Sequence, residues 1–156
     1  MKNASARALW GDYLDKHLEH AFVETPQVEY FCNNEQDANE CAELVKQGIK
    51  RATSHSLLGI QYRKESLPKI GDFIVVTDRE GKAQCIVRTT KVTLKPFFAI
   101  DSAYAQRQGE GDKSLAFWKK VHWDYYTKEL EAFGRLPRES MIVVCQEFEM
   151  VFQRQG

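Results

Sequence analysis

The spacing of apolar residues along the first quarter of the chain predicts a helix followed by an extended segment. Leu9, Tyr13 and their neighbours recur at i, i+4 spacing, which is typical of an amphipathic helix over about Ser5 to His20. We expect this helix to pack outside the main sheet. Pro26 ends the region, and Val28 to Cys32 forms either a short strand or an extended lead-in.

A second helical stripe follows, for which Asn34 is the expected N-cap and Gly48 the expected stop. Its apolar positions are Ala38, Cys41, Ala42, Val45 and Ile49. Beyond Gly48, a short helix is expected to begin at Ser54 or Ser56 and to run through Tyr62.

The second half of the chain contains the clearest strand patterns. We predict strands over Asp72–Thr77 and Ala83–Leu94, joined by a hairpin turn at 78–81, and a closing strand over Met141–Phe152. Between them, Asp101 or Ser102 caps a short helix, and a longer helix covers about Lys113–Phe133. Hairpin-linked strands with inserted helices predict an α+β fold with a small mixed sheet or partly closed barrel, mostly antiparallel.

Length and composition agree with one domain. The chain has 156 residues, of which 43% are hydrophobic, so it can bury a core without disulfides or metal. Its four cysteines lie apart, with no C-x-x-C pair, and are expected to be reduced core thiols. No apolar stretch is long enough to span a membrane and no secretory segment is evident, so we expect a cytoplasmic protein that does not bind membranes.

Charge is balanced overall, with 22 basic and 22 acidic residues, but it is segregated along the chain. Between residues 46 and 69, six cations face one carboxylate, Glu65, giving a local charge of +5. The cations are Lys46, Lys50, Arg51, Arg63, Lys64 and Lys69. A polyanion would therefore have to bind through a local patch.

The turn after the second helix is the first candidate for chemistry. Gly48 permits a sharp turn that projects Lys50, Arg51 and Thr53 together, so the segment resembles an anion cradle, to which Ser54 adds a hydroxyl. An ordinary basic helix end is the alternative interpretation.

The Gly-flanked loop 109–112 is the second candidate. Asp112 is placed to cap the following helix, which leaves Glu110 as the freer carboxylate and the better catalytic candidate. On that helix, Trp118 and His122 share one face that is either core or a surface for base stacking and phosphate contact. The histidines show no metal-binding spacing, and we expect neither metal nor cofactor.

Three separated segments resemble the ASCH domain family of the PUA-like superfold, in its longer bacterial branch. They are Leu44–Thr53, which is similar to the family's helix ending in G-x-K-x-x-T, Leu67–Asp72, and Gly109–Trp123. The resemblance covers about residues 30–151 and makes 1–28 an N-terminal helical extension of a single domain 1–156. It implies a small barrel with helices around a cleft, and RNA or a nucleotide-like molecule as ligand.

The resemblance also implies candidate roles. One branch of the family removes the acetyl group from 4-acetylcytidine with a Lys, a Thr and a Glu, to which Lys50, Thr53 and Glu110 correspond. Arg51, Ser54, His55, Trp118 and His122 are then the expected ligand-binding residues, with His55 where the short amidohydrolases commonly carry Arg. Other members have been described as ribonucleases.

Three functions follow from these features. The first is an RNA-binding domain with a basic cleft for single-stranded RNA or nucleotide, with ribonuclease activity as its enzymatic form. The second is an amidohydrolase that acts on an acylated cytidine nucleoside. The third is a non-enzymatic sensor of RNA or nucleotide, or an adaptor for a protein partner.

Overall fold

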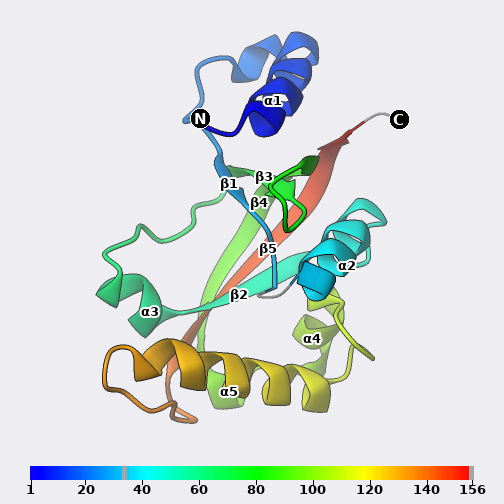
Figure 1. Ribbon diagram of the computed structural model, residues 1–156. Helices are drawn as coiled ribbons and strands as arrows, with labels where there is room; N and C mark the ends of the chain where they lie inside the picture. The colour runs from blue at the N-terminus through cyan, green and yellow to red at the C-terminus, as the bar shows by residue number, and fades with distance from the viewer. Residues whose placement is uncertain (33–34, 155–156) are drawn as a thin grey trace.

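The computed structural model describes residues 1–32 and 35–154 and shows one curled sheet with helices around it (Figure 1). The sheet has the strand order β1-β3-β4-β5-β2, in which β1 runs parallel to β3 and the other neighbours are antiparallel. Its strands are β1 (Gln27–Glu29), β2 (Ala52–Ser56), β3 (Phe73–Thr77), β4 (Ala83–Pro96) and β5 (Ile142–Gln153). The expected α+β fold of mostly antiparallel strands is confirmed.

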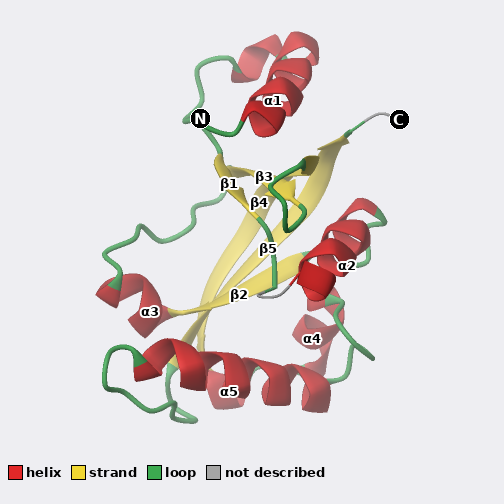
Figure 2. Ribbon diagram, in the orientation of Figure 1, coloured by secondary structure: helices red, strands yellow, loops and turns green. Residues whose placement is uncertain are grey.

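The long β4–β5 pair gives the sheet its curl. The two strands are paired from Cys85↔Gln153 to Pro96↔Ile142, and their register shifts at Ile86/Val87 and at Thr89/Lys91. Such bulges bend a strand and increase its twist. The sheet therefore wraps into a half-barrel, and the short strand β2 completes one edge of it (Figure 2).

In the described part of the chain, five α-helices lie around this sheet. They are α1 (Ala4–Lys16), α2 (Glu35–Lys46), α3 (Leu57–Tyr62), α4 (Ser102–Gln108) and α5 (Leu115–Glu131), with 3₁₀ turns η1 (Leu18–His20) and η2 (Phe97–Ala99). Three buried clusters hold the layers together: one beneath α1, one beneath α2, and one between the sheet and α4 and α5. No helix in the described ranges 1–32 and 35–154 is long and apolar enough to cross a membrane.

Most of the expected elements form where their patterns place them. The first predicted helix divides into α1 and η1, because the backbone leaves the helical conformation at His17. Ser56 rather than Ser54 is the cap of α3, since its hydroxyl accepts the Gly59 N–H. The Asn34 cap predicted for α2 lies outside the described residues.

Two expectations need correction. Strand β2 was not predicted, because its sequence is short and polar and gains its stability from pairing with β5 over Ala52↔Glu147 to Ser56↔Val143. The cysteines are not all reduced: Cys32 and Cys41, nine residues apart, form a disulfide. The contact depends on the fold, because it joins the segment after β1 to α2.

Candidate active site in the cleft

Lys50 enters the site through the turn after α2. Gly48 adopts a left-handed conformation (φ 75°), and the N–H groups of Ile49 and Lys50 then both bind the Leu44 carbonyl. This turn directs the chain into β2 and carries the Lys50 side chain inward, where it is only 1% exposed. The predicted turn at Gly48 therefore has a positioning role, but it buries Lys50 instead of presenting it to solvent.

Gly109 brings the second loop against this turn. It ends α4 in a left-handed conformation (φ 74°), and a Cβ at this position would lie 2.6 Å from the Ile49 carbonyl oxygen. Only glycine tolerates both the conformation and the close approach. The next residue, Glu110, is therefore placed directly beside Lys50.

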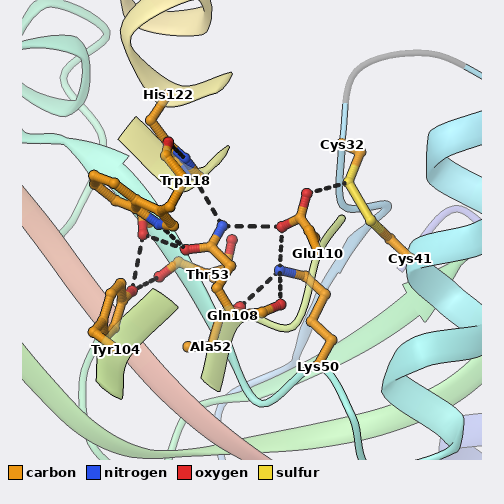
Figure 3. A network of polar contacts seen from close by, with 11 residues as sticks. Cys32, Cys41, Lys50, Ala52, Thr53, Tyr104, Gln108, Glu110, Trp118 and His122 are labelled. Carbon is orange, nitrogen blue, oxygen red and sulfur yellow. Dashed lines mark hydrogen bonds and ion pairs between the residues drawn. A yellow bond between two sulfur atoms is a disulfide. The ribbon is translucent and has the colours of Figure 1, made fainter. Parts of the chain in front are cut away.

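The Lys50 ammonium is fully engaged in this arrangement (Figure 3). Its Nζ donates to the Ala52 carbonyl at 2.7 Å, to the Gln108 carbonyl at 3.3 Å, and to Oε2 of Glu110 at 2.7 Å. The Phe31 ring lies 5.5 Å from Nζ. Because all three ammonium hydrogens have acceptors, Lys50 can take part in proton transfer only by exchanging one of these bonds.

Burial and the mutual contact of Lys50 and Glu110 set the pKa of both members of the pair. Burial lowers the pKa of Lys50, and the adjacent Glu110 carboxylate offsets part of that effect. Burial also acts to raise the pKa of Glu110, but the Lys50 charge, its hydrogen bond and that of Gln108 together hold this pKa below its usual value. At a given pH, Lys50 therefore spends a larger fraction of the time as the neutral amine than an exposed lysine does.

Gln108 connects the pair to α5. Its Oε1 accepts from Trp118 Nε1 at 2.8 Å and from Ser54 Oγ at 2.7 Å, while its Nε2 donates to Glu110 Oε2 at 3.0 Å. The indole N–H can only donate, so it determines which side of the amide carries oxygen. The side chain is 3% exposed and uses both ends of its amide.

His122 completes this network as a neutral ring. Nδ1 lies 2.8 Å from the Trp118 carbonyl and must donate to it, so Nε2 is the acceptor for the second Gln108 N–H at 3.0 Å. Burial lowers the pKa of His122 to about 4. Its lone pair is occupied and its ring is buried, so His122 supports the site rather than serving as a free base or a phosphate donor.

Trp118 also differs from its expected role. It is 3% exposed, packs against Phe97 and Tyr104, and stacks on His122 with ring centroids 4.1 Å apart. It therefore cannot stack on a base at the surface. The helical stripe in the sequence belongs to the core, and Trp118 acts on the site through its bond to Gln108.

Thr53 and His55 of β2 line a cleft of about 900 Å³ that also reaches Lys50 and Glu110. His55 donates from Nε2 to Gln146 at 2.8 Å, Gln146 binds Thr89, and burial lowers the His55 pKa. Within the described part of the chain, no hydrogen bond engages the Thr53 hydroxyl. This hydroxyl is therefore available to a molecule in the cleft.

The charged lining of the cleft is not basic. It contains four cations (Lys50, Arg63, Lys69 and Lys128) and six carboxylates (Glu24, Glu29, Glu65, Asp72, Glu110 and Asp124), a difference of −2 when all are ionised. The predicted basic patch is also dispersed. Arg63 pairs with Glu65 and Glu129, and Arg51 is exposed and does not line the cleft.

Two candidate site residues, Gln108 and Glu29, were not predicted from the sequence. Gln108 carries no recognisable motif, and its role depends on partners that the fold brings together. Glu29 lies half-buried in the cleft wall, with no hydrogen bond or ion pair among the residues that the structure describes. Burial and the neighbouring Glu65 raise the pKa of Glu29 to about 7.

Cys32, Cys41 and Glu110 place their ligand atoms within 4.8 Å of one another, as metal ligands would be. The two sulfurs are bonded to each other, and the carboxylate is held by Lys50. These donors are therefore engaged with one another and do not form a ready metal site.

A curled five-stranded half-barrel whose helices enclose a cleft defines an α+β domain of the PUA-like type. The family model described as ASCH domain matches residues 27–152, and the chain belongs to the ASCH domain family, whose members generally bind RNA. No curated protein matches the chain.

Solved structures agree with this assignment. An ASCH domain from Lactobacillus crispatus JV V101 is 31% identical, with a TM-score of 0.89 over 96% of this chain and 95% of its own. A protein from Enterococcus faecalis V583 is 30% identical, with a TM-score of 0.87 over 96% of this chain and 89% of its own. Since these matches leave few residues uncovered, α1 belongs largely to the shared structure.

Glu29 predicts a pH dependence of ligand binding. As pH falls from 8 to 6, Glu29 gains a proton and the cleft loses one negative charge, so an anion whose own charge is constant over this range should bind in the cleft roughly threefold more tightly. Calorimetric titration at the two pH values would measure this change. Glu29→Gln should remove most of the difference, whereas Glu24→Gln, at an exposed position of the same cleft, should retain it.

Proposed function

We propose that the cleft accepts one unstacked nucleobase, from single-stranded RNA or as a nucleoside, and that Lys50, Thr53 and Glu110 hydrolyse an acyl amide carried by that base. The single observation that carries this proposal is the buried Lys50–Glu110 pair at a cleft that Thr53 also lines, with a hydroxyl that no other described residue engages. A lysine with a lowered pKa that lines the same cleft as a hydroxyl can activate that hydroxyl as a nucleophile.

The size and charge of the cleft support a compact ligand. A volume of about 900 Å³ lies within the range of small-molecule sites and can hold a nucleoside with its flanking groups. The net charge of the lining opposes a long phosphate backbone, which usually binds through clustered Lys and Arg. RNA recognition would then depend on a single base inserted into the cleft, with most of the strand outside it.

The proposed reaction proceeds through a threonyl ester. Lys50 reacts as the neutral amine, the form that burial favours. The Thr53 oxygen attacks the acyl carbon and the Thr53 proton passes to this amine; the carbon–nitrogen bond then breaks as the departing amine takes up that proton from Lys50. Water subsequently cleaves the ester, releasing the acid and restoring Thr53. Glu110 keeps the Lys50 nitrogen in place and accepts its hydrogen bond throughout.

Ribonuclease activity is less well supported by the same geometry. Cleavage without metal needs an acid and a base near the 2′-hydroxyl and the leaving oxygen. His122 is buried and His55 is half-buried, both are hydrogen-bonded, and burial lowers the pKa of each. Lys50 and Glu110 alone would have to supply both groups.

Incubation with 4-acetylcytidine and, separately, with single-stranded RNA tests the proposal directly. Chromatography should show cytidine and acetate from the first and intact RNA from the second. Unchanged 4-acetylcytidine at high protein concentration would contradict amide hydrolysis, and RNA fragments would favour the nuclease. Binding of both ligands without turnover would indicate a sensor.

Thr53→Val should lower the hydrolysis rate by at least a hundredfold, because valine keeps the shape of threonine and removes the nucleophile. Protein stability should change little, since the hydroxyl has no partner among the described residues. Thr25→Val, at an exposed position of the cleft, is the matched control and should keep the wild-type rate. Equal rates in all three proteins would exclude Thr53 as nucleophile.

A further inference from the structure

We propose that Cys32 and Cys41 form a thiol–disulfide modification site whose redox state determines whether Oε1 of Glu110 is open to a ligand. The inference rests on the proposed function of Glu110 and adds covalent control of that residue. It is carried by the contact between the Cys32 sulfur and Glu110 at the cleft wall (Figure 3).

The pair lies where a redox change reaches the active site directly. Cys32 follows β1, is half-buried, and lines the cleft, whereas Cys41 lies in α2 and is 3% exposed. The same disulfide ties the cleft wall to the helix that leads into the Lys50 turn. An external thiol can therefore approach the Cys32 sulfur from the cleft.

The other two cysteines do not compete for this chemistry. Cys85 and Cys145 are both buried, and burial raises the pKa of their thiols to about 12 and about 11. Thiols of this kind react slowly because the thiolate is the reactive form. Redox chemistry is therefore confined to the pair beside Glu110.

The two oxygens of Glu110 have different surroundings. Oε2 accepts from Lys50 Nζ at 2.7 Å and from Gln108 Nε2 at 3.0 Å, whereas Oε1 lies 3.2 Å from the Cys32 sulfur. In the disulfide this sulfur carries no hydrogen, so Oε1 remains available to a ligand donor. In the dithiol, the Cys32 S–H donates to Oε1 and occupies it.

Reduction needs a dithiol as co-reactant. One of its thiolates attacks the Cys32 sulfur, the sulfur–sulfur bond breaks, and Cys41 leaves as a thiolate that takes up a proton. The second thiol of the reductant then attacks the mixed disulfide and releases Cys32 as a thiol. Two electrons and two protons pass to the protein, and the reductant becomes a disulfide.

Reduction of the disulfide should lower the ligand affinity and the hydrolysis rate of the site. With a third hydrogen bond, Glu110 holds its negative charge more tightly and competes less well for a ligand proton or donor. A single hydrogen bond of this kind corresponds to roughly a fivefold change in ligand affinity or rate. The oxidised protein should therefore be the more active form, by about that factor.

Two cysteine variants separate the effect of the Cys32 S–H hydrogen bond to Glu110 from the effect of the covalent Cys32–Cys41 link. Cys41→Ser leaves a permanent Cys32 thiol and should resemble the reduced protein under all conditions. Cys32→Ala has neither the disulfide nor a donor to Glu110, and should resemble the oxidised protein under all conditions. If both variants behave like the reduced protein, the loss of the disulfide link rather than the Cys32 hydrogen bond causes the change in affinity or rate, and the proposal fails.

A thiol count and a carboxylate titration give readouts that do not depend on hydrolysis. Alkylation of the denatured protein, followed by mass measurement, should label two cysteines after mild oxidation and four after reduction. Carbon-13 NMR of Glu110, assigned with Glu110→Gln, should give a lower titration midpoint in the reduced protein and in Cys41→Ser. Equal midpoints in both redox states, or four labels after oxidation, would overturn the proposal even if 4-acetylcytidine is hydrolysed.

Discussion

Lys50→Met should reduce hydrolysis of an acylated cytidine by roughly a thousandfold, the range expected when a proton-transfer group is removed. Methionine has a similar length but no donor, so the carbonyls of Ala52 and Gln108 and the carboxylate of Glu110 all lose their shared partner. The pKa of Glu110 should then rise, because burial is no longer opposed by the Lys50 charge.

The same substitution should lower the free energy of unfolding by about 3 kcal/mol, because removing one member of a buried pair leaves the other uncompensated. Glu110 is 20% exposed, and this exposure keeps the expected loss at the lower end of the range. Urea unfolding monitored by circular dichroism would measure it.

A double variant separates stability from catalysis. Lys50→Met with Glu110→Gln removes both charges, so it should regain part of the lost stability while remaining inactive. Lys46→Met is the matched control, because Lys46 lies at the surface end of α2 and its partners among the described residues are Glu43 and Gln84. A Lys50→Met protein with the wild-type hydrolysis rate would rule out Lys50 as the base.

The second large effect concerns pH and stability. His122 has a pKa of about 4 in the folded protein and about 6.5 when unfolded, so the fold favours its neutral form. This contribution is complete above pH 6.5 and is lost as pH falls toward 4, because the unfolded chain binds the proton first. The displacement from 6.5 to about 4 corresponds to about 3 kcal/mol.

His122→Asn tests this interpretation through the slope of stability against pH rather than through stability itself. Unfolding free energies measured between pH 4 and 7 should vary less in the variant than in the wild type. A residual slope is expected, because burial also lowers the pKa of His55 and the Lys50 charge favours ionised Glu110. An unchanged slope in His122→Asn would contradict the assignment.

Much of the fold is determined by local patterns. The i, i+4 spacing around Leu9 and Tyr13 predicts α1, and the alternation and β-branched residues after Gly81 predict β4. Such signals are reliable because each element has to bury one of its own faces. The family resemblance followed from three short motifs, and the matching of residues 27–152 confirms it.

Strand β2 and the Cys32–Cys41 disulfide were not predictable in this way. The sequence of β2 has no apolar alternation, and its strand conformation depends on pairing with β5, about 90 residues later. The disulfide depends on the segment after β1 folding back against α2. Both features come from contacts that composition and periodicity do not describe.

By itself, the sequence determined the α+β class, the order of the main elements and the candidate residues Lys50, Thr53 and Glu110. Only the tertiary structure decided how they are arranged: Lys50 is buried and paired with Glu110, Trp118 belongs to the core, and the cleft is not basic. The physical reason is that local patterns report which face of an element is apolar, whereas burial, pairing and pKa depend on residues brought together from distant parts of the chain.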